Sequence, residues 1–192
     1  RNFVTIEVTP QHLTLFSPDC YDRLGALAQM NPPFRNKSHQ NGLWKGIKDG
    51  TVNVIGSDHA PHTLKEKKNI WPASPSGMPG VQTLLPIMLN HVNNGKLDLK
   101  RLIELTSVNA AKIYNIKNKG YIKKGYDADI TIVDLDKKVI LKNNNIASKC
   151  KWTPFNNLQV KGFPFATIVN GSIKMLNGKV IREPDGKVVK FE

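Results

Sequence analysis

The chain has 192 residues, of which 40% are hydrophobic, and a formal net charge of +13. This length suits one ordinary domain or two small ones and is enough to bury a hydrophobic core. No stretch approaches the run of about 18 apolar residues that a membrane span requires, and the first residues lack the layout of a signal peptide. Because the chain opens on Arg1, without an initiator Met and inside a strand-like run, we expect its natural beginning to lie upstream.

The positive charge raises two hypotheses about partners, namely nucleic acid and a small anionic substrate. The lysines are scattered from Lys37 to Lys190 among many asparagines, without a dense basic helix or interleaved aromatic residues. This spread favours a solvated surface over a nucleic-acid interface, which would show a steep salt dependence of binding. The two cysteines, Cys20 and Cys150, form no Cys-x-x-Cys pair, so a reducing cytosol is the simpler compartment.

The first part of the sequence predicts a strand, a helix and a second strand. Val4–Val8 alternates β-branched with polar residues and stops before a Thr-Pro pair, and Val52–Gly56 is an apolar, β-branched run. Between them, apolar residues recur at helical spacing before the stop signal Asp49-Gly50. This order of elements implies that the two strands pair in parallel.

Helices and then strands are expected in the rest of the chain. Leu84–Val92 carries one apolar stripe that Asn93-Asn94-Gly95 ends, Asp98 is a good N-cap for the next helix, and a short helix is expected over Asn109–Tyr114. The expected strands of the tail are Ala128–Leu135, Phe165–Asn170, Ser172–Leu176 and Lys179–Ile181. Its hairpin signals are Asn170-Gly171, Asn177-Gly178 and Asp185-Gly186, which together predict an antiparallel meander. We therefore expect an α/β segment of residues 1–118 and a small all-β module of residues 119–192.

Chemistry-bearing side chains cluster directly after the second predicted strand, in Gly56-Ser57-Asp58-His59-Ala60-Pro61-His62. A parallel strand of an α/β barrel presents its C-terminal end to the active site. There the carboxylate of Asp58 could bind a divalent metal ion and accept a proton, although an Asp in this position also often caps a turn. Pro61 stiffens the turn, so the two imidazoles need not share a ligand: His62 could reach a substrate while His59 supports the loop.

Two further loops carry weaker signals. Ser76–Gly80 has glycines that would let the backbone approach a ligand, although loops of this composition are usually plain turns. In Asn31-Pro32-Pro33, a rigid neighbour holds the Asn amide in place.

Five segments match one enzyme family in the family's own order: Glu7–Leu13, Met30–Arg35, Ser57–Thr63, Gly77–Thr83 and Gly125–Thr131. In them the sequence resembles the dihydroorotases, in particular the bacterial type related to the dihydroorotase domains of multifunctional pyrimidine enzymes. The last segment is shared widely among amidohydrolases. The more specific motifs are Asn31-Pro32-Pro33, Asp58–His62 and Trp152–Phe155, and the nearest alternatives are hydantoinases and allantoinases.

The resemblance implies an α/β fold: the C-terminal portion of a (β/α)8 TIM-type barrel, with its last two strands and helices, followed by part of a small β-sandwich. Asp58 would be a zinc ligand and would shuttle the catalytic proton. Asn31 and His62 would hold the carboxylate and ring of the substrate, assisted by the backbone at Pro79 and Gly80. His12 belongs to a family motif, and we interpret it as structural.

The implied reaction is the zinc-dependent, reversible cyclisation of N-carbamoyl-L-aspartate to L-dihydroorotate in pyrimidine biosynthesis. Several metal ligands of the family have no match here: its His-x-His motif, its bridging Lys or Asp and two further His residues. We expect them upstream of Arg1 or on another chain. The sequence also leaves a homo-oligomer as an open alternative. Residues 1–192 alone should neither hold a binuclear zinc site nor turn over dihydroorotate. The alternative from a different class is a non-catalytic assembly module that has lost its metals.

Overall fold

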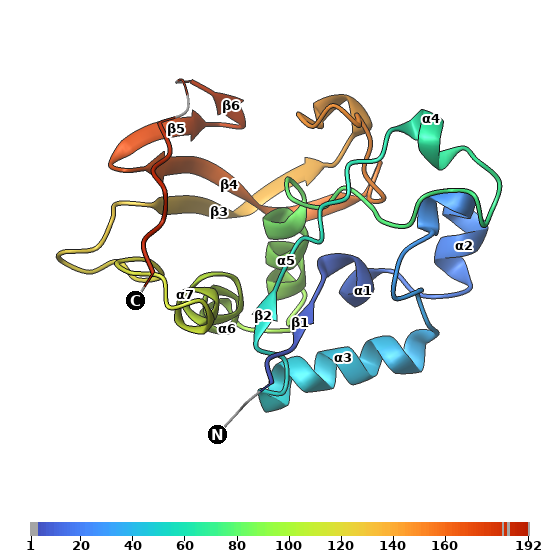
Figure 1. Ribbon diagram of the computed structural model, residues 1–192, viewed down its shortest axis with the longest axis horizontal. Coiled ribbons are helices and arrows are strands. Elements are labelled where there is room, and N and C mark those ends of the chain that lie inside the picture. Colours follow the sequence, from blue (N-terminus) through green and yellow to red (C-terminus); the bar gives the residue numbers. More distant parts are fainter. Residues whose placement is uncertain (1–3, 182, 184, 192) are drawn as a thin grey trace.

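A computed structural model describes residues 4–181, 183 and 185–191, with a helical first part and a strand-rich tail (Figure 1). The helices are α1 (Pro10–Thr14), α2 (Asp19–Leu24), α3 (Lys37–Asp49), α4 (Leu64–Lys67), α5 (Leu84–Asn93), α6 (Leu99–Ile103) and α7 (Asn109–Ile113). Shorter turns of other helix types are the 3-10 helices η1 (Gly25–Ala28) and η3 (Asn143–Asn145) and the π-helix η2 (Glu104–Val108). The strands are β1 (Glu7–Val8), β2 (Val54–Ile55), β3 (Ile130–Ile140), β4 (Gln159–Val169), β5 (Ser172–Leu176) and β6 (Lys179–Val180).

Strands β1 and β2 form the predicted parallel pair, in the register Glu7 with Val54 and Val8 with Ile55. Both are shorter than the sequence predicts. At the N-terminal end of the pair, the N–H of Ile6 donates to the side-chain oxygen of Asn53 (2.8 Å), so a side chain replaces the strand carbonyl. Val54 and Ile55 are buried in succession, as in a parallel strand that is covered on both faces.

The predicted helices of the first part are confirmed. Asn36 caps α3, its side chain accepting from the N–H of His39, and the helix ends at Gly50 in a left-handed conformation with φ of 86°. Asp98 caps α6 by accepting from the N–H of Arg101 (2.7 Å). The short helix expected around Asn109 is α7, which continues α6 through η2, so residues 99–113 form one helical run.

The tail is the predicted antiparallel meander, with the strand order β3, β4, β5, β6. Asn170-Gly171 and Asn177-Gly178 form its hairpin turns, and all four residues have positive φ, as type I′ turns require. β4 begins at Gln159, six residues earlier than expected; Pro164 lies in it beside a register shift, which accommodates a residue that has no N–H to donate. The third hairpin signal, Asp185-Gly186, was wrong for the described residues, because residues 185–190 belong to neither a helix nor a strand.

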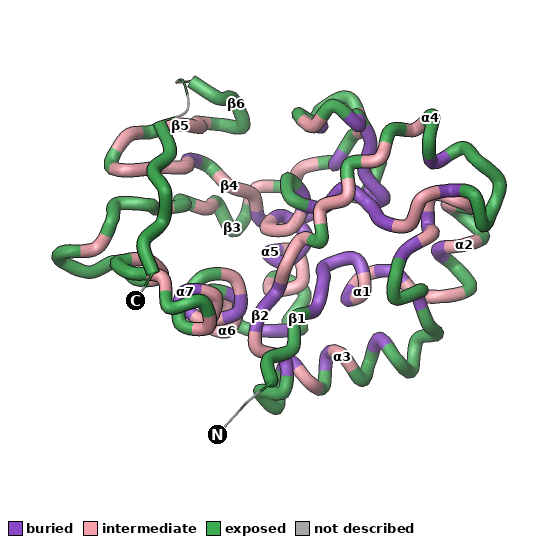
Figure 2. The backbone as a smooth tube through the Cα atoms, in the orientation of Figure 1, coloured by how far each residue is buried: buried purple, intermediate pink, exposed green. Residues whose placement is uncertain are grey.

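Two hydrophobic clusters form the core, visible as the buried segments around α1 and α5 (Figure 2). One joins β1, α3, β2 and α5 through side chains such as Trp44, Ile47 and Met88. The other combines Met30 and Ile87 with Trp152 and with further residues of the tail. The core therefore crosses the boundary that we expect between residues 118 and 119, and that boundary stays a prediction. In the described part of the chain, no helix is both long and apolar enough to cross a membrane.

Candidate functional site

Asp58 lies where the two parallel strands end. It follows β2 by three residues, its side chain is exposed, and its φ of 42° is in the left-handed region. The preceding carbonyl, of Ser57, accepts a hydrogen bond from the side-chain amide of Gln11 (3.0 Å). Because Gln11 comes from α1, directly after β1, the C-terminal ends of both strands contribute to this loop, as expected for a barrel mouth.

The fully buried Gln11 is a functional candidate that the sequence analysis missed. Its second amide atom, Oε1, is buried without a hydrogen-bond partner among the described residues. Gly80 packs directly against the amide: a Cβ atom there would lie 2.5 Å from both Gln11 Nε2 and the carbonyl oxygen of Ser57. The absence of a side chain at Gly80 thus lets the Gly77–Gly80 segment lie close to the loop that carries Asp58.

Asn31 and Asp58 line the same cavity, of about 410 Å³. The cavity also contains His12 and Arg35 from the matched segments, and Arg35 is a second residue that the sequence analysis did not single out. The His12 ring makes two hydrogen-bond contacts, with Thr9 Oγ1 (2.8 Å) and with the carbonyl oxygen of Pro32 (2.9 Å). It thereby ties α1 to the residue after Asn31, which agrees with a structural role.

The two histidines that follow Asp58 have different surroundings. Nδ1 of His59 accepts from the backbone N–H groups of Gly80 (3.1 Å) and Val81 (3.5 Å), so His59 supports the loop. The ring of His62 lies beside Gly77: a Cβ atom at Gly77 would lie 3.8 Å from its Cδ2 and Nε2 atoms. His62 is half-buried, with its own N–H donating to the carbonyl of Ala60 (2.9 Å).

The structure does not bring all five predicted site residues into one cavity. Pro79 and Gly80 line a second cavity of about 400 Å³, together with His59 and Trp152. His62 lines neither this cavity nor the one that contains Asp58. Asp58 and Asn31 are therefore grouped, while His62, Pro79 and Gly80 belong to the adjoining loops.

The tail reaches these loops through two side chains. The indole N–H of Trp152 donates to the carbonyl oxygen of His62 (2.7 Å). Gln82 binds the turn around η3 twice: its amide nitrogen donates to the Asn145 carbonyl (2.8 Å), and its amide oxygen accepts from the Ala147 N–H (2.8 Å). Residues 145–152 thus lie beside the loops that follow β2 and are hydrogen-bonded to them.

A buried lysine joins the segments that lead to Asn31 and Gly80. The Lys67 side chain is fully buried, and its ammonium group donates to the carbonyl oxygens of Gln29 (3.0 Å) and Pro75 (2.7 Å). Burial disfavours the charged form and lowers the pKa of Lys67 to about 8. The Gln29 carbonyl also accepts from the N–H of Gly77 (3.0 Å), so one oxygen atom connects three segments.

Asp58 is the one predicted metal ligand in the chain, and its exposed carboxylate is suited to bind a cation. The described residues contain no group of three or more His, Cys, Asp or Glu side chains that could hold a metal ion. A zinc site needs three or four protein ligands. Asp58 therefore fits as one ligand of a zinc site, and the described residues do not supply a complete set of ligands.

Comparison with known proteins gives one family. The sequence model of the amidohydrolase family matches residues 4–176. Curated relatives include the dihydroorotases of Halobacterium salinarum, 40% identical over 97% of this chain, and of Pyrococcus furiosus, 40% identical over 97%. The chain spans 43% of the length of each of these two relatives.

Solved structures of the same fold are named hydantoinase or dihydropyrimidinase. An L-hydantoinase (dihydropyrimidinase) from Arthrobacter aurescens superposes with a TM-score of 0.87 at 34% identity, covering 94% of this chain and 41% of the hydantoinase. A dihydropyrimidinase from Brevibacillus agri superposes with a TM-score of 0.86 at 27% identity, covering 93% of this chain and 40% of that protein. This chain is thus similar over nearly its whole length to two fifths of each of these larger proteins.

Proposed function

Because the chain belongs to the amidohydrolase family, we propose that it is part of a dihydroorotase that interconverts N-carbamoyl-L-aspartate and L-dihydroorotate. Its parallel strands would be the last two of a (β/α)8 barrel, and the tail would be part of a flanking β-sandwich. The other strands would come from outside these 192 residues. Support comes from dihydroorotase relatives at 40% identity and from hydantoinase structures of the same fold.

The observation that carries the proposal is the position of Asp58. Its carboxylate is exposed at the C-terminal end of a parallel strand and shares a cavity with Asn31. In the hydrolytic direction, Asp58 would take a proton from the attacking water and return it to the ring nitrogen as the amide bond breaks. In the reverse direction the same carboxylate would accept the proton of the carbamoyl nitrogen as the ring closes.

Zinc is part of this proposal. Asp58 would supply one ligand, and the bound ion would act as a Lewis acid on the scissile carbonyl and lower the pKa of a water molecule. The other ligands would come from the remainder of the barrel.

We further propose that Asn31 and His62 bind the carboxylate and ring amide of the substrate. Asn31 is exposed in the cavity of Asp58, and Arg35 in the same cavity supplies a positive charge that suits an anionic substrate. The backbone at Pro79 and Gly80 would border the site, since Gly80 contacts the carbonyl that precedes Asp58.

A hydantoinase is the second candidate function, favoured by the 34% identical L-hydantoinase structure. Both reactions open a cyclic amide. Dihydroorotate is a six-membered ring that carries a carboxylate, whereas hydantoin is a five-membered ring without one, so ring size and binding of the carboxylate separate the two functions.

The proposal is tested by Asp58→Asn in the full-length protein. The amide keeps the shape of the side chain but cannot accept the proton, so we expect kcat for ring opening of L-dihydroorotate to fall by about 1,000-fold or more, with the thermal midpoint unchanged. Asp49→Asn is the control, because Asp49 is exposed at the end of α3 and its carboxylate accepts from the N–H of Thr51 (3.0 Å), within its own turn. Near-normal turnover by the Asp58 variant would contradict the proposal.

A further inference from the structure

We infer that Trp152 is a positioning residue for His62, whose backbone it fixes from the tail. The inference rests on the proposed function, because that function assigns His62 to the substrate. It gives a role to the Trp152–Phe155 motif, which the proposed chemistry does not use.

The contact is a single hydrogen bond between residues that lie 90 positions apart. The indole N–H of Trp152 donates to the carbonyl oxygen of His62 over 2.7 Å, and the Trp152 side chain is only 1% exposed. A short hydrogen bond in a buried setting is strong, and a carbonyl that loses its partner there carries a desolvation penalty.

The indole itself is held firmly. It belongs to the hydrophobic cluster that joins both parts of the chain, with Met30, Phe34 and Ile87 from one part and Phe155 and Val160 from the other. The next residue, Thr153, donates its N–H to the side-chain oxygen of Asn143 (2.9 Å), and Gln82 fastens the turn around η3 to the loop that begins α5. Trp152 is thus a fixed donor that can hold a neighbouring loop.

The backbone of His62 is restrained on both sides of this carbonyl. Before it, the His62 N–H donates to Ala60 O, and Pro61 restricts the turn. After it, Thr63 caps α4 in a reciprocal capping box with Glu66. The bond from Trp152 meets the loop between these two restraints, at the carbonyl of the residue whose ring lies beside Gly77.

Trp152→Phe tests the inference in the full-length protein, because Phe keeps an apolar ring and removes the donor. We expect KM for L-dihydroorotate to rise by about tenfold, with kcat within about twofold, since the substrate loses an oriented contact while Asp58 is untouched. Trp44→Phe is the matched control. Trp44 is also buried and donates its indole N–H to a backbone carbonyl, that of Leu13 (3.1 Å), but this carbonyl is remote from His62 in the sequence and belongs to α1.

A second variant and a second readout keep the outcome decisive. Replacing Trp152 by 3-benzothienylalanine keeps the bicyclic shape without the N–H, and serves if the Phe variant does not fold. Amide hydrogen exchange of residues 59–66 should become about tenfold faster than in Trp44→Phe. Unchanged exchange, or a KM equal to that of the control, would overturn the inference. If the wild-type protein does not open dihydroorotate, the proposed function fails, and the exchange rates alone still decide whether Trp152 fixes the loop.

Discussion

At the scale of single residues, the fully buried Lys67 joins two segments near the candidate site. Its ammonium group satisfies two backbone carbonyls in a region without a carboxylate partner among the described residues. We expect Lys67→Met to lower the free energy of unfolding by about 2–4 kcal/mol, because the Pro75 carbonyl loses the ammonium donor and the Gln29 carbonyl keeps only the N–H of Gly77. Lys65→Met, at an exposed position of the same helix, should change it by less than about 0.5 kcal/mol. Urea unfolding of both variants measures the difference, and equal effects would refute the role of Lys67.

His91 makes stability depend on pH. Its ring is hydrogen-bonded to Thr14 Oγ1 (2.9 Å) and packs edge-on against Trp44, and burial, the largest cause, lowers its pKa from 6.5 to about 4. The unfolded chain therefore binds this proton first, so stability is lost as the pH falls from about 6.5 towards 4. From pH 7 to 4.5 the expected loss from this group is on the order of 2 kcal/mol.

The measurement is the free energy of unfolding of wild type and His91→Gln at both pH values. The variant should lose less stability on acidification, whereas His39→Gln, at an exposed position of α3, should behave as wild type. An identical acid loss in wild type and His91→Gln would show that the burial of His91 is not the cause.

The sequence could predict the site residues that belong to recognisable motifs. It could not predict the buried residues that support them. Asp58 and Asn31 follow from motifs, and the structure groups them in one cavity. Lys67 lies in the run Lys65-Glu66-Lys67-Lys68, which has the composition of a solvated surface, and Gln11 is one polar residue in a short helix. Their roles depend on carbonyls that are distant in the sequence, and no local pattern encodes those partners.

At the scale of elements, the packing of β4 on α5 depends on Gly162. This buried glycine has φ of 96°, and a Cβ atom there would lie 2.7 Å from Leu89 Cβ. We expect Gly162→Ala to cost about 1–3 kcal/mol more than Gly171→Ala, because both positions have positive φ but only Gly162 is crowded. Thermal unfolding of the pair isolates the contact, and equal costs would show that β4 can shift away from the helix.

The elements were predictable where a local signal marks their ends. The stop at Asp49-Gly50, the cap at Asp98 and the two Asn-Gly turns fix one helix end, one helix start and the hairpins within a few residues. Strand lengths were less predictable, because they depend on partners: β1 is cut short by the Asn53 side chain, and β4 extends past Pro164 through a register shift.

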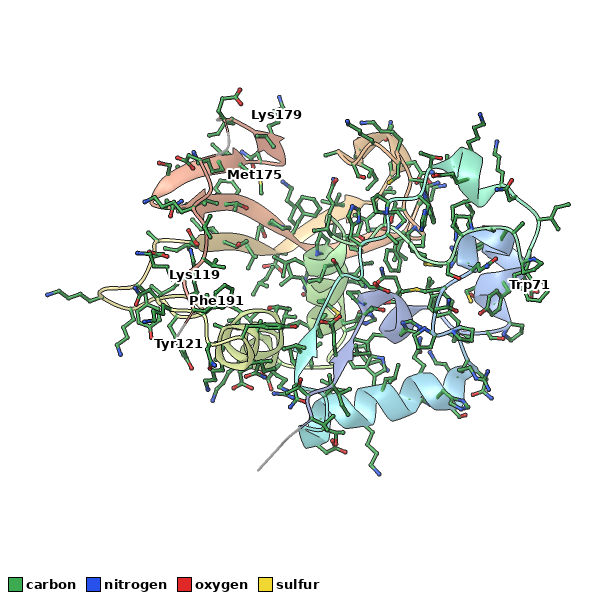
Figure 3. All side chains as sticks on the ribbon, viewed as in Figure 1. Trp71, Lys119, Tyr121, Met175, Lys179 and Phe191 are labelled. Carbon is green, nitrogen blue, oxygen red and sulfur yellow. The ribbon has the colours of Figure 1, made fainter. Side chains whose placement is uncertain are left out.

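At the scale of the whole molecule, the two parts of the chain share a core, and the tail takes part in the candidate site. The segment Gly125–Asp129 serves the tail itself: Lys119, which Figure 3 labels, forms ion pairs with Asp127 (3.0 Å) and Asp129, and Asp129 accepts from the N–H of Asn170. The hydrogen bond from Asn170, the largest cause, and Lys119 keep the pKa of Asp129 below its usual value. That residues 1–192 alone lack turnover and a binuclear zinc site stays a prediction.

By the proposed function, this chain is part of an enzyme that recognises a carboxylate-bearing cyclic amide. The direct measurement is kcat/KM of the full-length, zinc-loaded protein for L-dihydroorotate and for hydantoin under the same conditions. We predict a value for L-dihydroorotate about 100-fold higher or more, because hydantoin lacks the carboxylate that the site binds and has a smaller ring. A higher kcat/KM for hydantoin would contradict the proposed function and assign the chain to the hydantoinases.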